Sequence, residues 1–150
     1  MSDAAELGRL VGERGWVLVT GGRNAGVMAA ATNAAHAAGG LTIGILPWQF
    51  EDDELPAGLD VPIFTDLGNG RNNVIGLSAT ALVACGVDGP GTASEVALAL
   101  KNNKAVILLN AAEVAVRFFE SIGPGRVLRA RSAADAIRLI EERVGRHIGS

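Results

Sequence analysis

The sequence contains a single cysteine and no block of like charge, and both shortages exclude classes of protein. Because Cys85 is the only cysteine, no disulfide can form within the chain, and a zinc site of several thiolates is excluded. Charged residues make up 19% of the 150 residues, and the formal net charge is -3. Without a basic run, neither nucleic acid nor an anionic membrane is an expected partner. The sequence shows no metal-ligand spacing, so no metal site is predicted.

Long apolar runs and aromatic residues are also scarce. No apolar run reaches 18 residues and the N-terminus lacks the layout of a signal peptide, so we expect a cytoplasmic protein. Aromatic residues account for only 4%, yet apolar residues reach 49% and the mean hydropathy is +0.30. This surplus of small apolar side chains predicts that a second copy of the chain covers some helix faces.

Short apolar runs alternate with helical patterns along the whole chain. The runs lie at residues 16–20, 41–46, 61–65, 81–85, 105–109 and 126–129, and the helical patterns at 3–13, 26–38, 71–80, 93–102, 112–121 and 133–146. Most runs are continuously apolar, which indicates strands covered on both faces. The alternation predicts one α/β domain over residues 1–150, with a Rossmann-like, doubly wound, mostly parallel sheet and helices on both faces. The irregular stretch 47–60 is expected to arch over one edge of the site or to be mobile.

Glycine-rich turns mark the places where a ligand is expected. Each follows a predicted strand, and open α/β sheets bind ligands at the carboxyl ends of their strands. Glycine lets the backbone approach an anion, and the helix that follows presents unpaired N–H groups. The residues predicted to bind are Gly21, Gly22, Arg23, Asn24 and Gly26 in the first turn and Gly89, Pro90, Gly91 and Thr92 in the second. The first turn is neither a Walker A loop nor a G-x-G-x-x-G fingerprint, and packing explains its glycines equally well.

The second turn leaves two interpretations of Glu95 open. Thr92 is a natural helix N-cap, and Glu95 follows it by three residues, which is the spacing of a capping box. In that case the Glu95 carboxylate serves only the backbone of its own helix. Alternatively, Glu95 is a catalytic carboxylate at the mouth of a phosphate cradle.

A third turn, at residues 68–73, places Arg71 at a predicted helix start. A cation is disfavoured there by the helix dipole, so we expect Arg71 to point toward an anion. His36 lies on an alanine-rich helix with no second ligand in register, and we expect it to be an exposed or hydrogen-bonded histidine.

Read together, the motifs resemble those of molybdenum cofactor carrier proteins. The segments that carry the resemblance are 15–23, 26–28, 38–47, 60–63, 89–95, 97–101 and 118–119, and the resemblance extends over nearly the whole chain in one register. More distantly, the sequence is similar to Lonely Guy phosphoribohydrolases and lysine decarboxylase-like proteins. The resemblance implies a Rossmann-like fold, a dimer or tetramer, the molybdenum cofactor as bound cargo, and molybdoenzyme apoproteins as recipients.

The hydrolase pattern can be carried over position by position. Its P-G-G-x-G-T-x-x-E motif falls on residues 87–95, with Gly89, Gly91, Thr92 and Glu95 matched and Val87 and Asp88 replacing the leading proline and glycine. The catalytic arginine of the hydrolases falls on Arg71, and the lysine after it is replaced by Asn72. If the chain is a hydrolase, the resemblance assigns Arg71 and Glu95 as its catalytic residues.

Three functions follow from these observations. The leading hypothesis is a carrier that holds a phosphate-bearing small molecule, the molybdenum cofactor, through backbone amides with help from Arg71 and Arg23. The alternative is a nucleoside 5'-monophosphate phosphoribohydrolase, and the third is an oligomeric scaffold without a ligand. Relatives begin with a further strand and glycine-rich turn, whereas this sequence opens with the helix predicted from Asp3.

Overall fold

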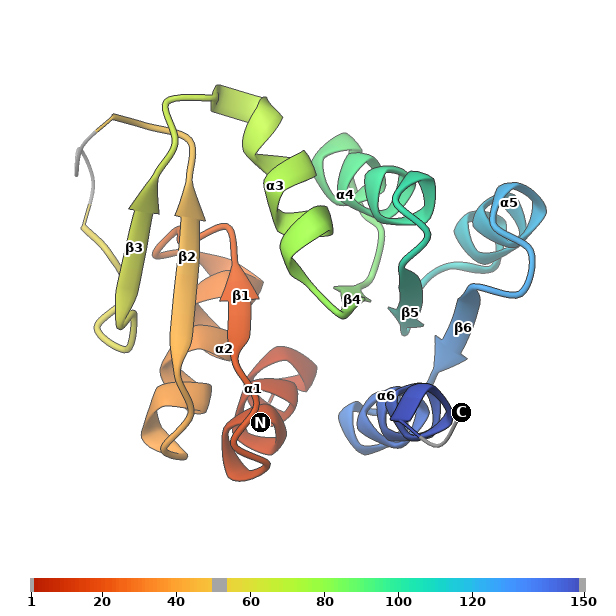
Figure 1. Ribbon diagram of the computed structural model, residues 1–150, viewed down its shortest axis with the longest axis horizontal. Coiled ribbons are helices and arrows are strands. Elements are labelled where there is room, and N and C mark those ends of the chain that lie inside the picture. Colours follow the sequence, from red (N-terminus) through yellow and green to blue (C-terminus); the bar gives the residue numbers. More distant parts are fainter. Residues whose placement is uncertain (1, 50–53, 149–150) are drawn as a thin grey trace. The chain divides into compact units, whose positions relative to one another are not determined.

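A computed structural model describes residues 2–49 and 54–148, which fall into two compact units, Met1–Ser78 and Ala79–Ser150 (Figure 1). The first unit contains α1 (Asp3–Glu13), β1 (Leu18–Thr20), α2 (Gly26–Ala37), β2 (Thr42–Leu46), β3 (Val61–Phe64), the 3-10 helix η1 (Gly68–Gly70) and α3 (Arg71–Ser78). The second contains β4 (Ala81–Cys85), α4 (Pro90–Lys101), β5 (Ala105–Leu109), α5 (Glu113–Ile122), β6 (Val127–Ala130) and α6 (Ala133–Ile148). The predicted α/β, Rossmann-like alternation of parallel strands and helices is confirmed.

Each unit has its own three-stranded parallel sheet. The strand orders are β1-β2-β3 and β4-β5-β6, so neighbours in the sequence are neighbours in each sheet. The register pairs Val19 with Ile43 in the first sheet and Val83 with Ile107 in the second. Because all strands of a sheet point the same way, their carboxyl ends and the turns that follow them lie along one edge.

The core of the second unit surrounds β5. Val106 and Leu108 belong to a cluster with side chains of α4 and α5, while Ile107 and Leu109 alternate to the opposite face and are equally buried. In Figure 1, α4 and α5 lie on one side of this sheet and α6 on the other. The prediction of a strand covered on both faces is therefore correct for β5.

The same prediction is wrong for β3. Val61 is 39% exposed and Ile63 is 41% exposed, because β3 is an edge strand that pairs with β2 alone in its sheet. A continuous apolar run does not distinguish a central strand from an edge strand. Pro62 carries the missing signal, since proline has no N–H to donate and is confined to edge strands.

Helices α1 and α2 pack with their backbones in close approach. A Cβ added at Gly8 would lie 2.1 Å from the Ala31 carbonyl oxygen, and one added at Gly12 would lie 2.5 Å from that of Ala35. Small residues at these positions thus set the spacing of the two helices. Within the described part of the chain, no helix has both the length and the apolar character needed to span a membrane.

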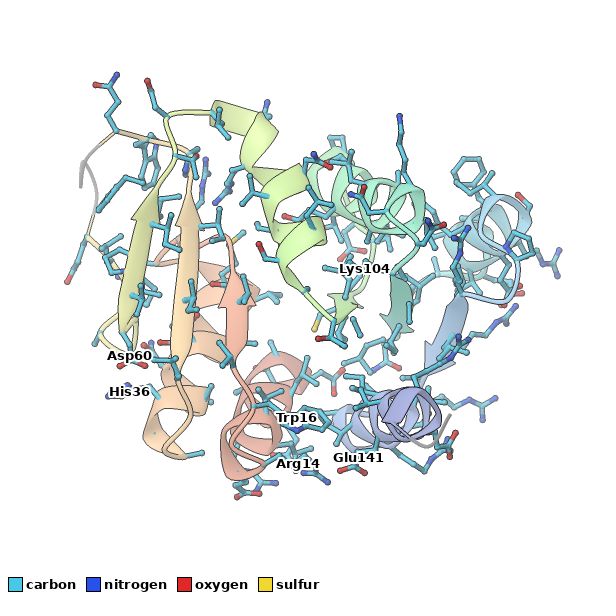
Figure 2. All side chains as sticks on the ribbon, in the orientation of Figure 1. Arg14, Trp16, His36, Asp60, Lys104 and Glu141 are labelled. Atoms are coloured by element: carbon cyan, nitrogen blue, oxygen red, sulfur yellow. The ribbon has the colours of Figure 1, made fainter. Side chains whose placement is uncertain are left out.

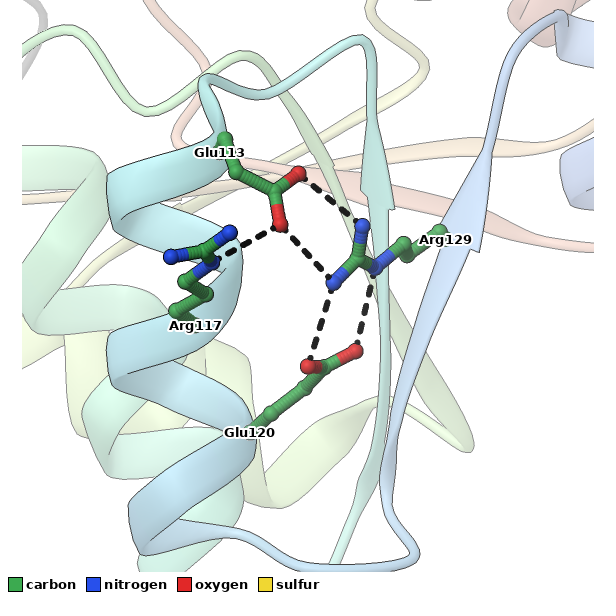
Figure 3. A network of polar contacts seen from close by, with 4 residues as sticks. All are labelled: Glu113, Arg117, Glu120 and Arg129. Carbon is green, nitrogen blue, oxygen red and sulfur yellow. Dashed lines mark hydrogen bonds and ion pairs between the residues drawn. The ribbon is translucent and has the colours of Figure 1, made fainter.

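An exposed network of ion pairs fixes α5 to β6 in the second unit (Figure 3). Arg129 on β6 donates to the carboxylates of Glu113 and Glu120 on α5, and Arg117 donates to Glu113 at 3.1 Å. The hydrogen bonds from Arg117 first, and from Arg129 second, lower the pKa of Glu113 from its ordinary value. The charged side chains of α5 in this network therefore form their ion pairs within the second unit.

Candidate functional site

The first glycine-rich turn connects β1 to α2 and is shaped by two buried glycines. Gly22 has a φ of +73° and donates its N–H to Thr20 Oγ1 at 3.1 Å. A Cβ added at Gly22 would lie 2.7 Å from a methyl of Leu46, so glycine is required for the turn to fit against β2. The next residues, Arg23, Asn24 and Gly26, are exposed.

Arg71 holds this turn from within the same unit. Its guanidinium Nη1 donates to the carbonyl oxygen of Gly21 and, at 2.9 Å, to that of Ile45, and the residue is only 7% exposed. A Cβ at Gly21 would lie 2.7 Å from Arg71 Nη1, so that glycine admits the guanidinium. The structure therefore brings the first and third predicted turns together. These two partners are carbonyl oxygens, and through them Arg71 links the carboxyl ends of β1 and β2.

A pocket of about 340 Å³ opens beside the first turn. Among the described residues, its lining includes Gly22, Arg23, Asn24, Ala25, Trp48, Glu54 and Leu55. The guanidinium carbon of Arg23 lies 5.7 Å from the centre of the Trp48 ring, within the range of a cation–π contact. Sequence reasoning missed Trp48 and Glu54 as site residues. The position of Trp48 in the sequence could have identified it. It comes two residues after β2 ends, and the carboxyl end of β2 lies beside that of β1, where the first turn begins.

Trp48, Glu54 and Leu55 belong to the irregular stretch 47–60 that was expected to arch over an edge of the site or to be mobile. Its described part contributes these three residues to the lining of the pocket. Residues 50–53 of the stretch lie outside the described residues.

The second glycine-rich turn lies in the second unit, between β4 and α4. Gly86, with a φ of +77°, donates its N–H to the Leu109 carbonyl oxygen at 2.8 Å. Gly89 is extended and forms the N-cap of α4, which begins at Pro90. A Cβ added at Gly89 or Gly91 would meet nothing within 4 Å, so open space lies over the start of this helix.

The prediction that Thr92 is the N-cap of this helix, with a capping box to Glu95, is wrong. Pro90 presets its φ for a first helical position and has no N–H to leave unsatisfied, so α4 starts two residues before Thr92. Thr92 lies inside the first turn, and Glu95, which is partly buried, lies in the second. The carboxylate of Glu95 is therefore too far along the helix to act as its capping-box partner.

The starts of α2, α3 and α4, which follow the three predicted turns, have no acidic residue in their first turn. The other α-helices differ, since α1, α5 and α6 all have an aspartate or glutamate there. Neither α2 nor α4 has a side-chain cap among the described residues, whereas Ser2 caps α1. Within the described residues, the positive dipole ends of α2 and α4 are thus not compensated by an acidic residue in their own first turn.

His36 forms a polar contact with the carboxylate of Asp60. His36 Nδ1 lies 2.9 Å from Asp60 Oδ1, and Figure 2 shows the two side chains together. The backbone N–H of Thr42 is the main cause that lowers the pKa of Asp60. His36 is therefore a hydrogen-bonded histidine, as expected. Across residues 2–49 and 54–144, whose side chains the structure describes, no cluster of three or more His, Cys, Asp or Glu side chains is placed to hold a metal ion.

Comparison with known proteins gives one consistent family. Residues 1–137 match the model of the SLOG cluster4 family. The structure of the molybdenum cofactor binding protein from the phototrophic bacterium Rippkaea orientalis is similar, with a TM-score of 0.90 and 46% identity over 95% of this chain and 86% of that protein. The molybdenum cofactor carrier protein of Chlamydomonas reinhardtii has a TM-score of 0.88 and 46% identity, with the same coverage.

A shorter match concerns a hydrolase. The cytokinin riboside 5'-monophosphate phosphoribohydrolase of Mycobacterium tuberculosis is 48% identical over 44 residues, which are 29% of this chain and 24% of that protein. This match is local, whereas the two solved structures align over nearly the whole chain. The chain belongs to the SLOG cluster4 family, and the resemblance to molybdenum cofactor carrier proteins that its motifs indicated is confirmed.

Proposed function

We propose that the protein is a cytoplasmic carrier that binds the molybdenum cofactor as cargo and protects it until transfer to a molybdoenzyme apoprotein. The observation that carries the proposal is the pair of uncapped helix starts, α2 and α4, each directly after a glycine-rich turn and free of acidic residues in its first turn. Such starts favour phosphate and other anionic groups. The similarity to named carriers over 95% of the chain supports the same function.

Each turn offers groups that can bind an anion within its own unit. The cofactor is a pterin with a terminal phosphate and a dithiolene-bound metal, so an anionic group of it suits the backbone amides at Gly26 in the first unit, or those at Gly91 in the second. Arg23 is exposed in the first turn, so its guanidinium is accessible to a phosphate. Arg71 supports the first turn from its buried side, because it donates a hydrogen bond to the carbonyl oxygen of Gly21 and adds a buried positive charge.

The protective role is tested by following decay of the cofactor in air. Released cofactor is mixed anaerobically with the protein, exposed to air, and sampled for its ability to reconstitute a cofactor-free molybdoenzyme. We expect the protein to slow the loss of reconstituting activity several-fold compared with the same concentration of serum albumin. A decay rate equal to that with albumin would contradict the carrier.

A phosphoribohydrolase remains the second candidate, favoured by one specific observation. The 48% identity to the mycobacterial hydrolase accompanies the retained motif residues Gly91, Thr92 and Glu95. In that reaction Glu95 would stabilise the developing positive charge on the ribose or activate water, and Arg71 would orient the phosphate.

Glu95→Gln separates the two functions. The substitution is nearly isosteric and removes the charge, so we expect cofactor binding to stay within about twofold of the wild type. If the protein were a hydrolase, the same change would lower the release of adenine from AMP by about 100-fold or more, as expected for loss of a general acid or base. Adenine release is measured by chromatography on both proteins. Hydrolysis by the wild type that Glu95→Gln eliminates would contradict a carrier without enzymatic activity.

The expected homo-oligomer has a candidate contact surface on α5. Val114, Phe118 and Ile122 recur at every fourth residue and are 78%, 57% and 50% exposed, while Val116 and Phe119 on the same helix are buried in the unit. The helix therefore has a second apolar strip beside the one that covers the sheet. We infer that a second copy of the chain covers this strip in a dimer or tetramer.

Phe118→Glu is expected to dissociate that oligomer. A charge placed at the centre of a buried apolar contact weakens association by roughly 30-fold or more. Light scattering after size-exclusion chromatography measures the mass, with Leu77→Glu, which removes a similarly exposed side chain from α3, as the control. An unchanged mass for Phe118→Glu, or equal dissociation by both variants, would contradict the assignment to α5.

A further inference from the structure

The pocket beside the first turn contains three kinds of chemistry in one place. The residues that line it include a cationic one, Arg23, an aromatic one, Trp48, and an acidic one, Glu54, next to Gly22 and Ala25. Its volume of about 340 Å³ is within the range of small-molecule sites. A ligand complementary to these three residues has an anionic group for Arg23, a flat π-system for Trp48 and N–H donors for Glu54.

Trp48 supplies a stacking surface that Arg23 covers. The ring is only partly buried, and the Arg23 guanidinium carbon lies 5.7 Å from its centre. A guanidinium is flat and delocalised, so the surface it occupies also suits a planar heterocycle. Because Arg23 is otherwise exposed and adjoins the uncapped start of α2, its guanidinium can move from the ring to a bound phosphate.

Glu54 is the acidic residue of the lining, and its carboxylate is the candidate acceptor for the edge of such a heterocycle. A carboxylate offers two oxygens and accepts a pair of parallel N–H donors. The 2-amino-4-oxo pyrimidine ring of a pterin presents such a pair on its amino group and neighbouring ring nitrogen. A lumazine, with oxygen in place of the 2-amino group, lacks one of the two donors.

We propose that this pocket holds the pterin ring of the cargo, stacked on Trp48, with the Glu54 carboxylate accepting from the 2-amino edge and Arg23 released to the phosphate. Trp48 and Glu54 then determine specificity, and Arg23 keeps the ring surface covered while the pocket is empty. The inference rests on the proposed carrier function, since it identifies the part of the cofactor that the first unit recognises.

The chain provides its own control for the stacking residue. Trp16 is the other tryptophan, is also partly buried, and lies under the guanidinium of Arg14 at 6.0 Å (Figure 2). It precedes β1, whereas the pocket follows the strand, so the two Arg–Trp pairs lie toward opposite ends of β1. Removing either indole deletes the same kind of contact, but only Trp48 lines the pocket.

The test is calorimetric titration with 6-hydroxymethylpterin monophosphate and its lumazine counterpart. For Trp48→Leu we expect binding of the pterin phosphate to weaken by about tenfold or more, the effect of losing one stacking contact. Trp16→Leu is expected to stay within about twofold of the wild type. The wild type is expected to prefer pterin over lumazine, and Glu54→Gln to remove that preference. Equal weakening by both tryptophan variants, or equal affinity of the wild type for the two probes, would overturn the proposal.

Loading with the cofactor itself separates this proposal from the carrier function. If Trp48→Leu and Glu54→Gln retain the molybdenum cofactor as fully as the wild type, the pocket assignment is wrong and the carrier stands. The assignment also fails if the wild type retains the cofactor but does not bind the pterin phosphate. If the wild type retains neither, both proposals are wrong.

Discussion

Gly91→Leu is expected to abolish retention of the molybdenum cofactor while leaving the stability of the protein nearly unchanged. Gly91 lies in the first turn of α4, where an added Cβ meets nothing within 4 Å and the backbone has no positive φ. Leucine can therefore be accommodated by the fold, but its side chain would cover the N–H groups that the proposed cradle offers to an anion. We expect cofactor affinity to fall by about 100-fold or more, equivalent to roughly 3 kcal/mol.

The matched control is Ala97→Leu, which adds bulk to an exposed position of the same helix. Both variants are expected to unfold in urea within about 0.5 kcal/mol of the wild type, as is usual for exposed substitutions. Retained pterin after desalting reports binding. Full retention by Gly91→Leu, or equal loss by Ala97→Leu, would show that the start of α4 is not part of the binding site.

Arg71→Met is expected to cause the largest loss of stability of the proposed substitutions. The guanidinium is 7% exposed and donates to the carbonyl oxygens of Gly21 and Ile45. Methionine retains much of the apolar stem and removes both donors, which leaves two acceptors at the ends of β1 and β2 without this partner. Loss of charge-assisted hydrogen bonds of this kind costs about 2–4 kcal/mol. Because the first turn loses its support, cofactor retention should also fall.

Arg23→Met is the companion variant, since Arg23 belongs to the same turn but is exposed. We expect it to weaken cofactor binding and to leave the free energy of unfolding within about 0.5 kcal/mol of the wild type. Urea titrations followed by circular dichroism measure both variants. If Arg71→Met unfolds at the same urea concentration as Arg23→Met, then the two carbonyl contacts do not support the turn as we describe.

Much of the fold could be predicted from hydrophobic pattern alone, because alternation of short apolar runs with helical periodicity indicates parallel α/β units. The errors arose where local backbone chemistry decides the outcome. Pro62 marks β3 as an edge strand, and Pro90 starts α4 before Thr92, yet neither effect changes the apolar pattern. Proline acts through its missing N–H and its fixed φ. Neither property affects the hydrophobic pattern from which the strands and helices were predicted.

In the candidate site, too, local features could be predicted from the sequence and long-range contacts could not. Glycine-rich turns after strands were visible in the sequence because the need for glycine is local, as at Gly22 with its positive φ. The partners of Arg71 were not, because Gly21 and Ile45 are distant in sequence and meet only when β1 and β2 pair. Trp48 was missed for the same reason, since its relation to Arg23 depends on two strands ending at one edge.

The central claim, that the chain carries the molybdenum cofactor, is tested most directly by retention. Purified protein is incubated anaerobically with released cofactor and desalted, and the protein fraction is oxidised to convert bound pterin to its fluorescent derivative, with AMP as a competitor. We predict pterin in the protein fraction at a fixed ratio per subunit, with no adenine formed from AMP. Absence of pterin from that fraction would contradict the carrier. Free adenine in the same samples would then favour the phosphoribohydrolase, and no response to either compound would favour a scaffold.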